Sequence, residues 1–213
     1  MQSNSITTDF WPLPATYQQV EWIQSDWNQR INTWLKWENK YIVEAKCIIN
    51  AMDYDVDACL FWSRWNSRPQ YCFYINFKWS WSYHYFSQYL NSDYSHSSGT
   101  PYTWNEYTIK STLLTTWNSL EVNWSTYFSW SYWSSYNNSM DLEIFGCHYQ
   151  WSLSNPFKWK VYYLIIKDWS NNIIKNYIPC YRKSDSVIWM YETVEWVFLV
   201  NSWSWTFTKW PDL

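Results

Sequence analysis

The sequence predicts an all-β protein, built as a sandwich or a barrel. Two segments, 41–50 and 71–78, alternate their side chains with a period of two residues, which is typical of half-buried strands. Further short apolar runs follow, separated by turn-like Ser, Asn and Asp residues at the spacing of antiparallel folds. No amphipathic segment of three helical turns stands out. The length of 213 residues suits one larger all-β domain or two small ones.

The remaining strands follow from the same pattern. Segments 106–114 and 119–123 flank Thr116-Trp117-Asn118 and predict a hairpin. Segment 159–169 is apolar on both faces, which indicates a central strand, and 187–200 predicts two short strands around a turn. We expect a flexible leader at 1–11 and a single domain at 12–213. Within the domain, the stretches 91–104 and 129–139 are expected to be loops.

Tryptophan and glycine occur in unusual numbers. The chain has 22 Trp and 2 Gly, whereas average composition would give about 15 Gly. Many tryptophans stand where turns normally place glycine, because glycine reaches positive φ without steric cost. These contexts are Asp26-Trp27-Asn28, Ser80-Trp81-Ser82, Trp117-Asn118, Asn123-Trp124-Ser125, Asp168-Trp169-Ser170 and Ser202-Trp203-Ser204-Trp205. The hypothesis is that most of these codons are UGA, which some bacterial lineages and their phages read as glycine.

Charge and cysteine content exclude several classes of protein. The net charge of −3 argues against a nucleic-acid partner. No apolar run approaches the roughly 20 residues of a membrane-spanning helix, and the first ten residues lack the pattern of a signal peptide. The five cysteines are widely spaced without a CxxC motif, so we expect free thiols, several of them buried in strands.

Three segments carry a family resemblance. They are YQQVEWIQSDWNQRINTW (17–34), ACLFWSRW (58–65) and the closing stretch 177–212. They resemble the laminin G-like, concanavalin A-like jelly-roll domains of the lectin and glucanase superfamily, which are common in gut bacteria and their phages. The resemblance spans about 12–212, and nearly every Trp falls where that family has Gly. Trp22 is an exception, and Asn32 stands where the family often has Asp.

The resemblance implies a jelly-roll sandwich of two antiparallel sheets. It also implies a module of a phage tail, a virion or a cell surface, located in the virion or on the extracellular surface, that binds glycans or other surface proteins. We expect no enzymatic activity, no cofactor and no membrane insertion. The alternatives are a structural or decoration virion protein without a ligand, and a glycoside hydrolase of the same superfamily.

Sugar recognition needs aromatic rings and planar hydrogen-bonding groups on one surface. The polar sides of strands 41–50 and 71–78, with residues near them in sequence, supply such groups. The candidate carbohydrate-binding residues are Glu44, Lys46, Arg64, Tyr74, Asn76 and Tyr85. The same residues would also suit an ordinary solvated sheet or a subunit contact.

Two acidic motifs offer weaker alternatives. Asp141 and Glu143 share a strand face, as a glycosidase pair would, but a third carboxylate does not follow, and an exposed strand face is the simpler interpretation. A second motif resembles the start of a calcium loop, but Ala58 and Arg64 replace the Gly and Glu that an EF-hand needs. Its calcium candidates are Asp53, Asp55 and Asp57. The histidines at positions 84, 96 and 148 lack metal-ligand spacing.

Overall fold

The fold is known from a computed structural model. It describes residues 12–25, 29–38, 40–49, 58–64, 72–80, 83–90, 93–96, 105–131, 137–145, 147–149, 152–154, 159–199 and 207–213. Within these ranges the regular structure consists of β-strands, as the two-residue periodicity predicts, and no helix of the length and hydropathy needed to cross a bilayer occurs there.

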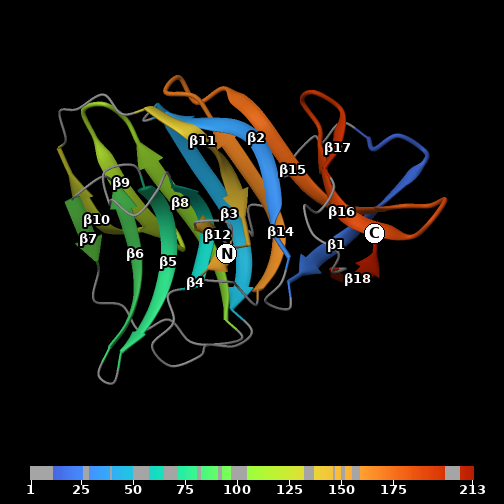
Figure 1. The fold of residues 1–213 in the computed structure, drawn as a ribbon, viewed down its shortest axis with the longest axis horizontal. Coiled ribbons are helices and arrows are strands. Elements are labelled where there is room, and N and C mark those ends of the chain that lie inside the picture. Colours follow the sequence, from blue (N-terminus) through green and yellow to red (C-terminus); the bar gives the residue numbers. More distant parts are fainter. Residues whose placement is uncertain are drawn as a thin grey trace, which may run out of the picture.

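The larger sheet contains ten antiparallel strands in the order β10-β9-β8-β3-β14-β1-β15-β16-β17, with β18 paired to β1 (Figure 1). Its strands are β1 (Tyr17–Gln24), β3 (Tyr41–Ile49), β8 (Glu106–Leu113), β9 (Asn118–Val122), β10 (Ser125–Trp130), β14 (Trp159–Lys167), β15 (Ile173–Arg182), β16 (Val187–Glu192), β17 (Val197–Leu199) and β18 (Thr208–Asp212).

The smaller sheet has six antiparallel strands in the order β2-β11-β4-β5-β6-β7. Its strands are β2 (Ile31–Glu38), β4 (Ala58–Arg64), β5 (Cys72–Ser80), β6 (Tyr83–Leu90), β7 (Asp93–His96) and β11 (Asn137–Ile144). A separate hairpin pairs β12 (Cys147–Tyr149) with β13 (Ser152–Ser154). The chain passes repeatedly between the two large sheets, and this crossing connectivity is that of a jelly-roll sandwich, which confirms the predicted fold class.

The main core lies between the two sheets. Strand β3 contributes Val43, Ala45 and Cys47, and the six-stranded sheet contributes Ile31 and Phe61 among others. From Val43 to Cys47 the buried positions of β3 are the alternate ones that the sequence pattern predicts, because successive side chains of a strand point to opposite faces; Ile42, on the other face, is buried as well.

Several predicted elements are confirmed at the level of the backbone. The strands β8 and β9 form the expected hairpin, β14 lies centrally between β3 and β1, and β16 and β17 flank the expected turn. The predicted loops at 91–104 and 129–139 are wrong in part, because β7 lies within the first and the ends of β10 and β11 lie within the second. Paired backbone in these Ser-, Tyr- and Asn-rich stretches overrides their turn-like composition.

Two cysteines are described in full, and both fit the expectation of buried free thiols. Cys47 and Cys180 are free and buried, and burial raises the pKa of Cys180 to about 12. A thiol with so high a pKa stays protonated at neutral pH and behaves as a small apolar side chain. The side chains of the other three cysteines lie outside the described part of the chain.

The strand β1 occupies a fork in the larger sheet. Strands β14 and β15 pair directly from Leu164 to Lys167, next to the turn that joins them. Further along, β1 pairs antiparallel with both strands: Tyr17 to Gln19 pair with β15, and Ile23 and Gln24 pair with β14. The last strand, β18, continues the pairing of β1, with Val20 opposite Asp212.

The exposed tryptophans in the described ranges divide into two groups, and among these five only Trp34 lies within a strand, β2, rather than in a turn. Trp34, Trp124 and Trp196 have φ values of 57°, 65° and 62°, in the left-handed region that favours glycine, and all three are exposed. Trp117 and Trp169 are also exposed but do not have positive φ, so the conformational argument for glycine does not extend to them.

Candidate functional site

The predicted residues Glu44 and Lys46 lie on the outer side of the ten-stranded sheet. Their neighbours on β3, Val43 and Ala45, are fully buried in the core, so the alternation of the strand turns Glu44 and Lys46 away from it. Both side chains are half-buried, which makes them part of a surface that is polar and partly enclosed.

Both residues form ion pairs with neighbouring strands. The Lys167 Nζ atom lies 2.9 Å from Glu44 Oε1, and the Lys46 Nζ atom lies 2.9 Å from Glu106 Oε1. Partly exposed pairs of this kind contribute about 0–1 kcal/mol each to stability. Their main effect here is to fix the side chains and to balance charge across β14, β3 and β8.

Two tyrosines stand beside these ion pairs because of a bulge in β14. Val161 is opposite Cys47 and Tyr163 is opposite Lys46, so the extra residue in β14 is Tyr162. The Lys46 Nζ atom lies 4.8 Å from the ring centroid of Tyr162, which places that ring on the outer side as well. The bulge therefore brings two consecutive aromatic rings toward Lys46.

Both tyrosines stay neutral well above physiological pH. Partial burial, followed by the charges of Glu106 and Glu21, raises the pKa of Tyr162 to about 12. Burial and then the charge of Glu44 also raise the pKa of Tyr163. Both phenols can therefore donate a hydrogen bond at any ordinary pH.

This surface is called the tyrosine face below. Its residues are Glu44, Lys46, Glu106, Tyr162, Tyr163 and Lys167. It combines aromatic rings with hydroxyl donors and mutually neutralised charges, which is a chemistry suited to polar, uncharged ligands.

The other four predicted binding residues belong to the six-stranded sheet. Arg64 lies on β4, Tyr74 and Asn76 on β5, and Tyr85 on β6, with Tyr85 opposite Lys78. The prediction that all six residues share one surface is therefore wrong at the level of topology, because β3 and β5 belong to different sheets. The side chains of these four residues lie outside the described part of the chain, and their binding role stays a prediction.

The acidic pair on β11 is more enclosed than expected. Glu143 is 9% exposed, and its Oε1 atom lies 2.7 Å from Arg30 Nη1, which is equally buried. Asp141 is half-buried and accepts a hydrogen bond of 3.0 Å from Asn32 Nδ2. The expectation of an exposed strand face is wrong for Glu143, because the segment before β2 places Arg30 against it.

Asn32, whose role the sequence left open, organises the start of β2. Its Oδ1 atom accepts a 2.7 Å hydrogen bond from the backbone N–H of Trp34, the residue with φ of 57°. The Thr33 hydroxyl donates to the Leu142 carbonyl and accepts from the Leu35 N–H. These contacts tie β2 to β11 and set the position of Asp141.

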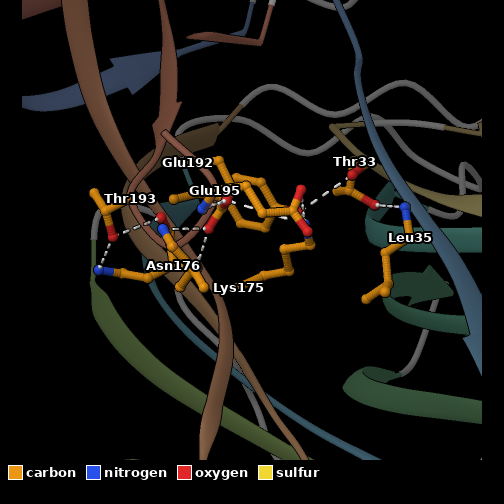
Figure 2. Close-up of polar contacts among 9 residues, drawn as sticks. Thr33, Leu35, Lys175, Asn176, Glu192, Thr193 and Glu195 are labelled. Atoms are coloured by element: carbon orange, nitrogen blue, oxygen red, sulfur yellow. Dashed lines mark hydrogen bonds and ion pairs between the residues drawn. The ribbon is translucent and has the colours of Figure 1, made fainter. Parts of the chain in front are cut away.

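A second polar network was not predicted, and Figure 2 shows it between β15, β16 and β2. Glu192 is 2% exposed, and its carboxylate accepts hydrogen bonds from the backbone N–H groups of Asn176, Val194 and Glu195. The Lys175 Nζ atom lies 2.5 Å from Glu195 Oε2. Because Glu192 is satisfied by the turn that follows it, the network holds the β16–β17 turn in place.

The same network reaches the smaller sheet. Asn176 Nδ2 donates to Thr193 Oγ1 at 2.9 Å, and the Tyr177 hydroxyl donates to the Thr33 carbonyl at 3.3 Å. The only signal in the sequence was the Glu192-Thr193 pair before a turn, since the partners from β15 and β2 are distant along the chain.

No group of three or more His, Cys, Asp or Glu side chains in the described ranges could hold a metal ion. The calcium candidates Asp53, Asp55 and Asp57 lie outside these ranges, and calcium binding there stays untested. The three histidines lie on β6, β7 and β12, and their side chains also fall outside the described part.

No protein-family model and no curated protein matches the sequence. Among solved structures, domain 4 of AbnA, an extracellular arabinanase from Geobacillus stearothermophilus in complex with arabinotriose, is 12% identical with a TM-score of 0.47, covering 76% of this chain and 85% of that one. Domains LG4-5 of the mouse laminin alpha1 chain are 10% identical with a TM-score of 0.46, covering 76% and 44%. Tailspike protein 2 of bacteriophage CBA120 is 10% identical with a TM-score of 0.47, covering 78% and 31%.

Proposed function

We propose that the chain is a non-enzymatic jelly-roll module of a phage tail, virion or cell-surface protein, and that it binds carbohydrate. The observation that supports carbohydrate binding is the tyrosine face. There, two neutral tyrosines stand next to charges that are already paired, 2.9 Å apart in both the Lys46–Glu106 and the Lys167–Glu44 pair. Such a surface offers aromatic contact and hydrogen bonds without attracting ions.

A glycan array tests this proposal directly. The wild-type chain should bind at least one class of glycan, and Tyr162→Ala should weaken that binding because it removes the ring beside Lys46. Tyr127→Ala controls for the loss of a half-buried ring elsewhere, since Tyr127 lies on β10, at the far edge of the same sheet, and packs against the main core. Absence of binding to any glycan would favour a structural or decoration protein instead.

The alternative of a glycoside hydrolase rests on Asp141 and Glu143. The burial of Glu143 against Arg30, at 2.7 Å, favours a structural role over contact with a substrate. Release of reducing sugar from a polysaccharide, lost in both Asp141→Asn and Glu143→Gln, would support the enzyme and contradict the proposal.

We also propose that most of the tryptophans stand for glycine encoded by UGA. Trp34, Trp124 and Trp196 support this, since each has a positive φ and an exposed ring, whereas Trp22 is buried. Sequencing the gene decides the matter: UGG codons at positions 34, 124 and 196 would exclude recoding, and UGA codons would support it. The genes beside it test the virion assignment, because tail or capsid genes are expected there.

A further inference from the structure

A second group of aromatic rings lies on the outer side of the ten-stranded sheet. Ile178, Cys180 and Tyr191 form a small buried cluster that is separate from the main core, and Tyr17 and Phe198 pack against it. Val20 of β1 is in the main core, so Tyr17, three residues earlier on the same strand, lies on the opposite face.

The rings of this group contact one another closely. Tyr17 stacks on Phe198 with 4.8 Å between centroids and an interplanar angle of 29°, and Tyr17 lies 5.0 Å from Tyr191. Tyr17 and Phe198 remain half-exposed, while Tyr191 beneath them is buried. Tyr17, Tyr191 and Phe198 are called the aromatic platform below.

The cation that contacts the platform is already paired. The Arg182 guanidinium lies 5.4 Å from the Phe198 centroid, and its Nε and Nη2 atoms bind the Asp185 carboxylate at 2.5–3.1 Å. Since Arg182 already binds the Asp185 carboxylate, it presents planar hydrogen-bonding groups whose charge is neutralised by its partner.

The strand β1 connects the platform to the tyrosine face. Ile23 of β1 is opposite Val161, the residue before Tyr162, and Tyr17 lies six residues before Ile23 on the same strand. At the rise of a β-strand this separation is at most about 20 Å. The two surfaces are therefore neighbours on one side of the same sheet.

We propose that the aromatic platform is a second subsite for the same glycan, and that its ligand is an uncharged oligosaccharide long enough to reach from Tyr162 to Tyr17 and Phe198. This rests on the proposed carbohydrate binding. The apolar side of a sugar ring contacts the half-exposed edges of the Tyr17 and Phe198 rings, which stack on each other, while Arg182 and Asp185 contact its hydroxyl groups. The neutral surroundings select against acidic polysaccharides.

Titration calorimetry with neutral disaccharides and long neutral oligosaccharides of glucose, galactose, mannose, xylose and arabinose tests the subsite. The wild-type chain should bind a long oligosaccharide more tightly than its disaccharide. Phe198→Leu keeps the apolar packing but removes the ring, and should weaken the long ligand by about two- to tenfold with little effect on the disaccharide. Tyr17→Leu should do the same, Tyr162→Ala should weaken both ligands, and Tyr127→Ala neither.

The outcomes separate the two proposals. Unchanged binding of long oligosaccharides in both Phe198→Leu and Tyr17→Leu, with loss in Tyr162→Ala, would overturn the subsite and leave the proposed function standing. The subsite would also be overturned if the wild-type chain bound no neutral oligosaccharide, or bound only acidic ones. If it bound neither neutral nor acidic glycans, both the subsite and the proposed function would be overturned. Analytical ultracentrifugation of the same variants tests whether a second copy of the chain occupies the platform instead. If the wild-type chain is a dimer and Phe198→Leu makes it a monomer, the platform is a dimer contact and the glycan subsite is overturned.

Discussion

The turn between β9 and β10 gives the sharpest test of the tryptophan hypothesis. Asn123 and Trp124 have φ values of 50° and 65°, and Val122 pairs with Ser125 around them. Two central residues with positive φ define the type I′ hairpin, whose preferred sequence is Asn-Gly. Trp124 therefore occupies the position where glycine is most favoured, and we expect Trp124→Gly to stabilise the chain.

The size of the effect follows from the backbone and the exposure of the ring. The left-handed conformation costs a residue with a Cβ atom roughly 1–2 kcal/mol, and the extra freedom of glycine in the unfolded chain offsets about 0.5–1 kcal/mol of the gain. The ring is 63% exposed, so its removal loses little burial. The net gain is about 0.5–1 kcal/mol, and for a chain of this length it raises Tm by about 1–4 °C.

Thermal unfolding of three variants checks this reasoning. Trp169→Gly is the matched control: its ring is 72% exposed in another turn without positive φ, so glycine should leave Tm unchanged or slightly lower. Trp22→Gly removes a buried ring and should cost about 3–5 kcal/mol. An unchanged or lower Tm in Trp124→Gly would refute the conformational argument, as would an equal rise in Trp169→Gly.

Three further predictions concern polar and titrating groups. Glu143→Gln should lower the unfolding free energy in urea by about 3–5 kcal/mol, because it removes the negative charge that faces the buried Arg30 guanidinium at 2.7 Å. A loss below about 1 kcal/mol would mean that water reaches the pair. Glu192→Ala should lower the free energy of unfolding by about 1–3 kcal/mol, because it removes the acceptor of three backbone N–H groups. Glu195→Ala should lower it far less in the same assay, because the Glu195 side chain is 62% exposed. The pKa of Tyr162 is about 12 in the folded state, above the ordinary tyrosine value of 10.0. Between these two pH values the folded state binds more protons than the unfolded state, so the free energy of unfolding should fall as the pH rises from about 10 to about 12. Tyr162→Phe should make the alkaline fall shallower, and an identical fall in both proteins would contradict the assigned pKa.

Periodicity predicted the faces of strands better than their partners. The alternation around Val43 predicted which side of β3 enters the core, and the doubly apolar β14 was correctly expected to be central. A period of two residues says which side chains share a face of one strand, but it does not say to which sheet the strand belongs. For that reason Glu44 and Tyr74 were expected on one surface although their strands lie in different sheets.

The polar contacts of the candidate sites were hidden for a related reason. Arg30 and Glu143 are 113 residues apart in the sequence, and the burial of Glu143 depends on that pairing. The Tyr162 bulge likewise depends on how β14 registers against β3, which no local pattern specifies. Long-range register decided these features, whereas local composition decided the turns.

The position of β1 in the fork between β14 and β15 has a consequence for how the chain folds. Strand β1 is held by residues from 160 onward, and its partner β18 spans Thr208–Asp212. The centre of the larger sheet therefore cannot close until residues about 190 positions away in sequence are available, and such non-local pairing is slow. While β14 and β15 wait for β1, their open edges could pair with another chain, so we expect refolding yield to fall steeply as protein concentration rises.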